Sequence, residues 1–316
     1  MRLGRVTVFG GSGFIGRYVV ERLADRDAVV AVAVRDVEGA KFLRTLGQVG
    51  QVAPVPCAVQ YEESVAAAVA GSDAVINLVG ILAQRGSQTF RALHERAPGT
   101  IARAAAAAGV KRLVHVSALG ADPEGPSKYA RSKAAGEAAV RAAFPQATIL
   151  RPSLVFGPED GFFNMLGGLA RLSPVLPLYN WGRTRFQPVW VGDVAAAAMA
   201  ALDRADAPGA TWELGGPRVW TFADLARFVL AETRRRQLLV PLPWQAGIPP
   251  ALVLGLLPKP PLTLDQLHQL RADSVVGEGA FGLPELGIRP MAVEAIVPQY
   301  LARYRRGGRL GRMAEA

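Results

Sequence analysis

Hydrophobic positions in the first half of the chain form short apolar runs that alternate with longer, alanine-rich segments. Several of the short runs are apolar at nearly every position, which is typical of strands covered on both faces. Strands are therefore predicted at 5–9, 29–34, 51–55, 74–78, 113–116 and 148–150, with helices that begin near residues 13, 37, 62, 89 and 127. Strands that alternate with helices in this way predict an α/β fold with a doubly wound parallel sheet.

The pattern changes after Arg151, where glycine and proline become frequent and the apolar runs shorten. One extended run, 187–194, is followed by an alanine-rich helix to residue 203 and returns to the α/β pattern. We therefore predict an α/β core at 1–158 and 187–206, a smaller C-terminal region at 159–186 and 207–302 that covers a substrate or partner, and a basic tail at 303–316.

Composition narrows the function classes. Half of the 316 residues are hydrophobic and a fifth are charged, so the chain is expected to fold around a core. The formal charge is +10, of which the five arginines and one glutamate of 303–316 contribute +4. The +6 that is left is ordinary for a globular surface. Because no basic helix with interleaved aromatic residues recurs, no nucleic-acid partner is predicted.

Other features bear on the compartment. Cys57 is the only cysteine, which excludes a disulfide framework and fits a reducing compartment. The first strand begins by Val6, too early for a secretory or transit peptide, so a cytoplasmic location is expected. The uncharged stretch 237–258 is long enough to span a bilayer, but Pro241, Pro243, Pro249 and Pro250 interrupt it and exclude a single spanning helix. His94 and His115 are the histidines near the candidate site, and neither has a metal-ligand partner at useful spacing, so no metal site is predicted.

Residues 251–257 form an apolar patch with two alternative interpretations. The patch could be a buried cap over a substrate pocket. It could instead belong to a surface, 238–258, that contacts a membrane interface or a hydrophobic partner. Arginines within 303–312 would then add attraction to anionic lipid.

A glycine-rich turn follows the first strand directly and opens a helix. Gly10, Gly13 and Gly16 permit a tight turn, close approach of the backbone to a pyrophosphate, and close packing of the helix on the sheet. Phe14 and Ile15 begin that helix, where free N–H groups and the helix dipole attract phosphate. The turn predicts that a dinucleotide binds here in a Rossmann-type core.

The tip of the second strand indicates which dinucleotide. An acidic residue there usually accepts hydrogen bonds from the ribose of NAD, whereas an arginine accommodates the 2′-phosphate of NADP. Arg35 stands at this tip and favours NADP(H) over NAD(H). Asp36 is adjacent and could contact a ribose if the register differs by one residue.

A candidate catalytic set lies further along. Tyr129 and Lys133 are four residues apart and therefore share a helix face. An ammonium beside a phenol stabilises the phenolate, so the tyrosine could act as a general acid or base. Ser117, at the end of the strand 113–116, could hydrogen-bond the same substrate oxygen. By contrast, His115 is expected to be a hydrogen-bonded core residue, His94 a residue with little chance of a functional contact, and Asp193 a helix N-cap.

Several segments together resemble an extended or atypical short-chain dehydrogenase/reductase. Within that superfamily the chain is most similar to the nucleotide-binding accessory subunit of respiratory complex I and its bacterial relatives. The resemblance covers roughly residues 5–235 and is carried by the glycine triplet and by 14–20, 75–80, 115–117, 127–129, 133–137, 144–149, 151–158 and 188–194.

The resemblance implies a tightly held NADP(H). It implies that Asn77, Leu78 and Gly80 contribute to nucleotide binding and that Pro152 and Ser153 line the nicotinamide end. It implies an accessory or assembly subunit of complex I (NADH:ubiquinone oxidoreductase) in which the nucleotide is largely structural, peripheral on the cytoplasmic face of a bacterial inner membrane. The alternative is an active NADPH-dependent reductase, dehydrogenase or epimerase among quinone-metabolism enzymes, in ubiquinone biosynthesis.

Overall fold

The structure is a computed structural model that describes residues 4–255, 257 and 260–308. Contacts divide the chain into two units. The first contains the residues up to Pro152, together with Val191–Leu214 and Gly277–Arg289, and the second contains Ser153–Trp190, Gly215–Val276 and the residues from Pro290 on. This division assigns 153–158, 187–190, 207–214 and 277–289 to other units than the predicted domain boundaries do. The predicted domains themselves stay a prediction.

The first unit is built on a parallel sheet. Among the described residues, seven strands lie in the order β11-β6-β5-β4-β1-β2-β3. The strands are β1 (Arg5–Phe9), β2 (Val29–Val34), β3 (Val52–Pro56), β4 (Ala74–Asn77), β5 (Arg112–Val116), β6 (Thr148–Pro152) and β11 (Thr211–Leu214). All neighbouring pairs are parallel, which confirms the predicted α/β, Rossmann-type fold. The strands that follow β1 in the chain lie on both sides of it, with β2 and β3 on one side and β4, β5, β6 and β11 on the other. Sheets of this type bind ligands at such a switch point, at the carboxyl ends of the strands.

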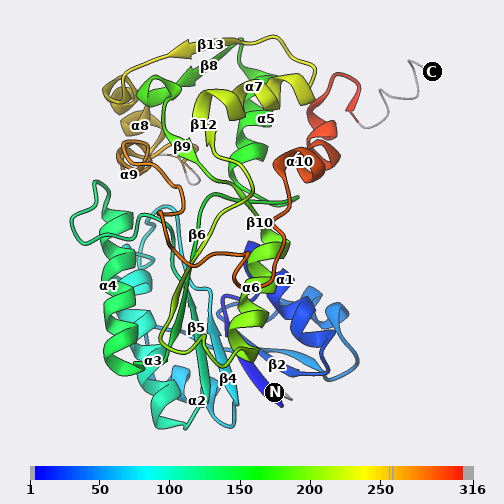
Figure 1. Cartoon of the computed structure of the whole chain (residues 1–316), viewed down its shortest axis with the longest axis vertical. Helices are drawn as coiled ribbons and strands as arrows, with labels where there is room; N and C mark the ends of the chain where they lie inside the picture. The colour runs from blue at the N-terminus through cyan, green and yellow to red at the C-terminus, as the bar shows by residue number, and fades with distance from the viewer. Residues whose placement is uncertain (1–3, 256, 258–259, 309–316) are drawn as a thin grey trace. The chain divides into compact units, whose positions relative to one another are not determined.

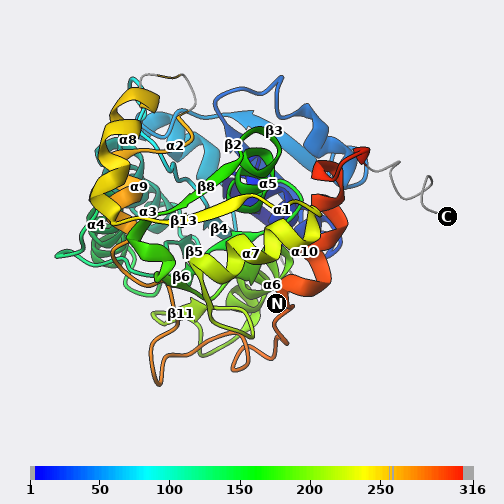
Figure 2. The same ribbon diagram turned by 90° about the horizontal axis from the view of Figure 1, so that it is seen from above.

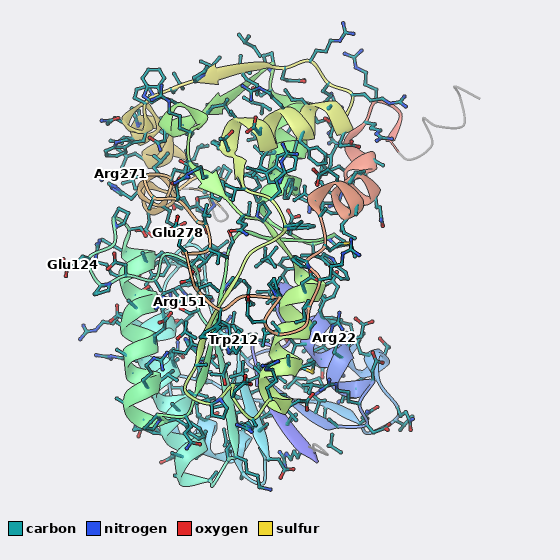
Figure 3. All side chains as sticks on the ribbon, in the orientation of Figure 1. Arg22, Glu124, Arg151, Trp212, Arg271 and Glu278 are labelled. Carbon is teal, nitrogen blue, oxygen red and sulfur yellow. The ribbon has the colours of Figure 1, made fainter. Side chains whose placement is uncertain are left out.

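Helices cover both faces of this sheet (Figure 1). On one face lie α1 (Phe14–Ala24) and α6 (Val191–Asp203), and Arg22 Nη2 in α1 donates to the Gly192 carbonyl at 3.0 Å (Figure 3). The other face carries α2 (Glu62–Val69), the π-helical turn η2 (Arg91–Arg96), α3 (Ala97–Ala107) and α4 (Lys128–Ala143). Small residues allow close packing here, since a Cβ at Gly136 would lie only 2.0 Å from the His94 carbonyl oxygen.

Two local predictions are wrong. No α-helix begins near Val37, because the Asp36 carboxylate accepts a hydrogen bond from the Gly39 N–H at 2.9 Å and closes a turn, after which the 3-10 helix η1 (Lys41–Leu46) forms. The extended run at 187–194 is a strand only at Val189–Trp190, and α6 begins at Val191. Asp193 therefore lies inside the first turn of α6 and is not its N-cap.

The second unit consists of short strand pairs and helices (Figure 2), and aromatic residues contribute much of its core. The pairs are β7 (Val155–Phe156) with β10 (Val189–Trp190), β9 (Arg185–Phe186) with β12 (Trp220–Thr221), and β8 (Val175–Leu178) with β13 (Leu238–Pro241). The helices are α5 (Phe162–Leu172), α7 (Phe222–Glu232), α8 (Ile248–Leu254), α9 (Leu264–Gln269) and α10 (Val293–Leu301), with 3-10 turns η3 (Tyr179–Gly182), η4 (Trp244–Gly247) and η5 (Ala302–Tyr304). Phe163 of α5 and Phe222 of α7 belong to this core.

The apolar patch at 251–257 is mostly exposed. Ala251 is buried, whereas Leu252, Val253 and Leu257 are 56%, 68% and 49% exposed. Residues 256 and 258 of the predicted surface, and 309–316 of the predicted basic tail, lie outside the described residues. In the described part of the tail, Arg305 donates to the Glu232 carbonyl at 2.7 Å. No helix within the described residues combines the length and hydropathy needed to cross a bilayer.

Candidate functional site

The glycine turn between β1 and α1 has the backbone that a pyrophosphate requires. Gly10 adopts φ +77°, which side chains disfavour, and a Cβ there would lie 3.0 Å from the Leu78 backbone. The Gly13 N–H donates to the Gly10 carbonyl at 3.0 Å and closes the turn. A Cβ at Gly16 would lie 2.3 Å from the Gly10 carbonyl oxygen, so only glycine lets α1 begin this close to the turn.

The N-terminus of α1 is open to a ligand. Gly13 is exposed and is the N-cap, and no side chain caps the helix. Phe14 and Ile15 begin the first turn, half-buried, and that turn contains no acidic residue. Its N–H groups are thus available to an anion and its dipole is not neutralised. These residues fit the phosphates of a dinucleotide.

The two charged residues at the end of β2 differ in their hydrogen bonding. Arg35 is exposed and has no hydrogen bond or ion pair with another described residue. Asp36 is exposed too, but its carboxylate is engaged by the Gly39 N–H. At this strand end the Arg35 guanidinium is therefore available to a ligand, whereas the Asp36 carboxylate already accepts one hydrogen bond from the chain.

The loop after β4 lies beside the glycine turn. The Leu78 N–H donates to the Phe9 carbonyl at 2.9 Å, and Asn77 Oδ1 accepts from the Val79 N–H at 3.0 Å. A Cβ at Gly80 would lie 3.4 Å from Lys133 Nζ, so this loop passes close to the candidate catalytic lysine. The residues at 77–80 are therefore placed between the phosphate turn and α4.

The structure brings the predicted catalytic residues together on β5 and α4. Lys133 is buried, and its Nζ donates to the Val116 carbonyl at 3.3 Å, directly before Ser117. The same Nζ lies 5.9 Å from the centre of the Tyr129 ring. Ser117 is 4% exposed, and its Oγ has no hydrogen-bond partner among the described residues. A buried hydroxyl without a partner is costly unless a ligand or water binds it.

His94 is the residue that sequence reasoning missed. Its Nε2 accepts from the Ile81 N–H at 2.9 Å, and its Nδ1 lies 3.0 Å from Ser132 Oγ. Because Ser132 donates to the Tyr129 carbonyl at 2.8 Å, Nδ1 carries the proton and donates to the serine. The ring also meets the Tyr129 ring edge-on at 5.3 Å. Burial lowers the pKa of His94 to about 3, with Lys133 adding to the effect, so the ring is neutral.

His115 only partly matches its prediction as a satisfied core residue. Asn77 Nδ2 donates to its Nδ1 at 3.1 Å, but its Nε2 is buried without a partner among the described residues. Burial lowers its pKa to about 3 as well, with Lys133 and His94 contributing. Lys133 therefore faces two neutral imidazoles.

Pro152 and Ser153 stand at a unit boundary. In the first unit the Pro152 carbonyl accepts from the Leu119 N–H at 2.9 Å. In the second unit Ser153 Oγ donates to the Ser274 carbonyl at 2.6 Å and accepts from the Gln187 N–H at 3.2 Å. Their contribution to the nicotinamide end stays a prediction.

The parallel sheet and the open glycine turn define a Rossmann-type fold of the kind that binds nicotinamide nucleotides. A family model described as NAD(P)H-binding matches residues 10–162. In fold, the chain is similar to the NADPH-dependent quinone oxidoreductase QOR2 of Escherichia coli, solved with NADPH, at a TM-score of 0.74, 20% identity, and 94% and 99% coverage of the two chains.

The sequence relatives are more specific. The chain is 37% identical over 314 residues to NADH dehydrogenase [ubiquinone] 1 alpha subcomplex subunit 9 of Arabidopsis thaliana, which covers 96% of this chain and 78% of the relative. It is 35% identical over 197 residues to the ceramide reductase of Caulobacter vibrioides, covering 62% of this chain and 60% of the reductase. The chain belongs to the family of the complex I alpha subcomplex subunit 9, and its first half matches the NAD(P)H-binding family.

Proposed function

We propose that this chain is an accessory or assembly subunit of a respiratory complex I, at the cytoplasmic face of a bacterial inner membrane, and that its nucleotide is largely structural. The observation that carries the proposal is the 37% identity to subunit 9, which extends over 96% of the chain. A likeness of this extent includes both units, not the nucleotide-binding core alone.

The nucleotide proposed is NADP(H) rather than NAD(H). Arg35 is exposed without a described partner, whereas the Asp36 carboxylate already accepts the Gly39 N–H within a turn. An arginine in this position suits a 2′-phosphate, with which it can form charge-assisted hydrogen bonds.

A structural role for the nucleotide follows from the open α1 terminus. A pyrophosphate there would satisfy N–H groups that no side chain caps. A ligand that binds only the folded chain adds stability in proportion to RT ln(1 + [L]/Kd), about 4 kcal/mol at a thousandfold excess over Kd. Tightly held nucleotide would therefore stabilise the first unit, and this role requires no turnover.

The experiment has two parts. A tagged chain is expressed in its own bacterium, and membranes solubilised in mild detergent are separated on a native gel that is stained for NADH dehydrogenase activity and probed for the tag. The proposal expects co-migration with complex I or an assembly intermediate. Nucleotide released from the purified chain is then identified by mass, with NADP(H) expected. Migration of all the tag at the size of the free chain would overturn the complex I proposal, and recovery of NAD alone would overturn the Arg35 argument.

The second candidate is an active NADPH-dependent reductase, dehydrogenase or epimerase, including one in quinone metabolism. The specific observation in its favour is the complete Ser117, Tyr129 and Lys133 set, with an unsatisfied Ser117 hydroxyl. The dinucleotide, when bound, supplies or accepts hydride. The Tyr129 phenol would donate a proton to a substrate oxygen, Lys133 would stabilise the phenolate, and Ser117 would orient the substrate. Quinone-dependent oxidation of NADPH that disappears in Tyr129→Phe would favour this candidate over the first.

Membrane contact through 238–258 and 303–312 belongs to the same proposal. It is supported by the exposed Leu252, Val253 and Leu257 and by arginines among 303–308. Sedimentation with anionic vesicles, at low and high salt, tests the contact. Binding that is unchanged by deletion of 303–316 and insensitive to salt would contradict the electrostatic part.

A further inference from the structure

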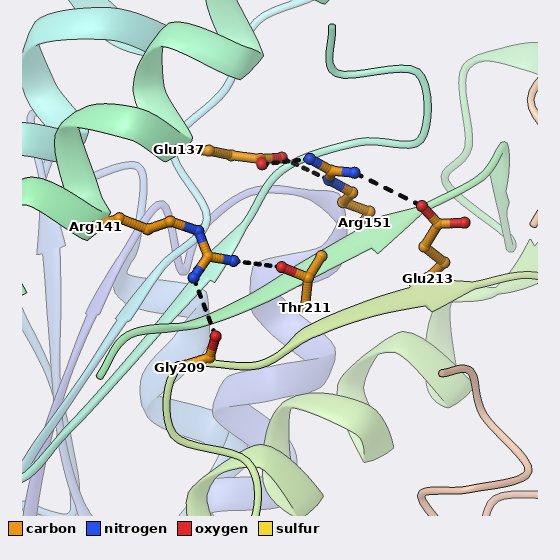
Figure 4. Close-up of polar contacts among 6 residues, drawn as sticks. All are labelled: Glu137, Arg141, Arg151, Gly209, Thr211 and Glu213. Carbon is orange, nitrogen blue, oxygen red and sulfur yellow. Dashed lines mark hydrogen bonds and ion pairs between the residues drawn. The ribbon is translucent and has the colours of Figure 1, made fainter. Parts of the chain in front are cut away.

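Four charged side chains of the first unit form a line of alternating sign that starts at the candidate catalytic lysine. Lys133 and Glu137 lie on α4, Arg151 on β6 and Glu213 on β11. Arg151 donates from Nε to Glu137 Oε1 at 2.9 Å and from Nη2 to Glu137 Oε2 at 2.7 Å (Figure 4). Its third nitrogen lies 3.6 Å from Glu213 Oε1, and Glu213 Oε2 accepts from the Gly277 N–H at 2.9 Å.

Glu137 is placed between two cations that can compete for it. It follows Lys133 by four residues on α4, a spacing at which opposite charges usually pair on a helix. Arg151 takes both carboxylate oxygens in the bidentate geometry that makes arginine pairs strong. Among the described residues, no carboxylate lies within ion-pair distance of Lys133, whose Nζ donates instead to the Val116 carbonyl.

The burial of these groups strengthens the electrostatic interactions between them. The Glu137 side chain is 7% exposed and that of Arg151 is 28% exposed, so solvent screens their interaction weakly. Burial lowers the pKa of Lys133 to about 8, and Glu137 opposes this shift from a distance. The other titratable groups around Lys133 are Tyr129 on α4, His94 on η2 and His115 on β5, and both histidines are neutral.

We propose that Arg151 is a positioning residue: by holding both oxygens of Glu137, it keeps the Lys133 ammonium free of a carboxylate partner. Lys133 is then available to the Tyr129 phenol and to the nicotinamide ribose. The last step rests on the proposed nucleotide binding, whereas the competition of the two cations for Glu137 does not. Without Arg151, the Glu137 carboxylate turns toward Lys133 and pairs with it.

The charge state of Lys133 can be followed directly in nucleotide-free protein. The chain has only five lysines, so ¹³C-lysine NMR gives few signals, and the Lys133→Met spectrum assigns the relevant one. In Arg151→Gln the pKa of Lys133 is expected to rise by about one unit, the size of shift that a carboxylate within ion-pair distance produces. An unchanged or lowered pKa in Arg151→Gln would overturn the proposal.

A second variant keeps the test decisive if Arg151→Gln fails to fold. Arg151→Lys retains a cation opposite Glu137 but holds it through a single point, so a smaller upward shift is expected. Arg141 supplies the matched control, because this α4 arginine donates to the Gly209 carbonyl and to Thr211 Oγ1 on the same strand edge and touches no carboxylate (Figure 4). Arg141→Gln should leave the pKa of Lys133 where it is. A shift as large as that in Arg151→Gln would mean that any lost arginine produces it.

The double variant Glu137→Gln/Arg151→Gln tests whether Arg151 affects the pKa of Lys133 through Glu137. If Arg151 acts on Lys133 through Glu137, replacing Arg151 has no upward effect once Glu137 is neutral. A rise of equal size in the Glu137→Gln background would show direct repulsion between the two cations instead and would overturn the proposal.

Nucleotide binding provides a separate readout. NADPH affinity at neutral pH is expected to fall by about tenfold in Arg151→Gln and to recover in the double variant, where Lys133 is again unpaired. Failure to recover would overturn the link to the ribose. A wild-type chain that binds no NADPH would refute the proposed function, whereas the NMR measurement would still decide the competition for Glu137.

Discussion

Gly16→Ala and Gly13→Ala form a matched pair that separates packing from ligand approach at the phosphate turn. A Cβ at residue 16 would lie 2.3 Å from the Gly10 carbonyl oxygen and 2.5 Å from the Gly11 Cα, both backbone atoms that cannot rotate away. Relief requires α1 to move by about 1 Å, and overpacking of this kind costs about 1–3 kcal/mol or more. Gly16→Ala should therefore lose stability and nucleotide together.

Gly13→Ala should behave differently. Gly13 has φ −77°, is exposed, and would bring a Cβ no closer than 3.2 Å to the Gly10 carbonyl oxygen. The free energy of unfolding of nucleotide-free protein should fall by less than about 1 kcal/mol, the difference between glycine and alanine at an N-cap. The new methyl group lies at the open helix terminus, so NADPH affinity should fall by about 10–100-fold, equivalent to about 1.4–2.8 kcal/mol.

Urea unfolding and calorimetric titration with NADPH measure the two quantities separately. The expected result is a lower urea midpoint for Gly16→Ala than for Gly13→Ala, with weakened NADPH binding in both. Wild-type affinity in Gly13→Ala would refute the placement of the pyrophosphate at this terminus. Wild-type stability in Gly16→Ala would refute the packing argument.

Three further predictions concern single side chains. Arg35→Ala should weaken NADPH binding by about 10–100-fold, the worth of a charge-assisted hydrogen bond, and should leave NADH binding unchanged, with Asp36→Ala as control. Equal losses for both nucleotides would contradict a 2′-phosphate contact. Tyr129→Phe should retain bound NADPH, and if the wild type oxidises NADPH with quinones, the variant should not; undiminished oxidation would remove Tyr129 from the chemistry. Because the pKa of folded His94 lies at about 3, below its ordinary 6.5, its contribution to stability is present above pH 6.5 and is lost as the pH falls toward 3. His94→Phe should make unfolding less sensitive to acid in that window, although His115 keeps its own share, and an unchanged slope from urea titrations would contradict a neutral buried His94.

The elements that the sequence predicted well are those that depend on local information. β1 and β2 have the predicted limits, because a short run of mostly β-branched and apolar residues leaves a buried parallel strand little freedom in where it starts. The glycine turn is equally local, since its tight backbone and the start of α1 lie within seven residues. The order of the strands then brings the carboxyl ends of β1, β4 and β5 to one edge, which places Ser117 near Lys133.

The parts that could not be predicted depend on contacts distant in sequence. His94 is 38 residues from Ser132, and nothing near it in the sequence marks the hydrogen bonds that fix its tautomer. The helix predicted near Val37 fails because one side-chain bond, from the Gly39 N–H to Asp36, competes with the helical pattern. Segment 277–289 joins the first unit through backbone bonds such as that from the Glu213 N–H to the Phe281 carbonyl, which carry no side-chain signal.

The buried Lys133 connects the two candidate functions. The pKa of Lys133, about 8, lies below the ordinary 10.5. Its contribution to the free energy of unfolding is therefore fully present only above pH 10.5 and is lost as the pH falls through 8. At neutral pH the ammonium therefore lowers the stability of the nucleotide-free chain by about 3 kcal/mol. An apolar side chain would avoid this loss, and Glu137, the carboxylate that raises the pKa of Lys133, is held by Arg151. A ribose that accepts hydrogen bonds from Lys133 would offset the loss equally in an accessory subunit and in a reductase, so a buried Lys133 fits the proposed nucleotide binding and does not by itself indicate turnover.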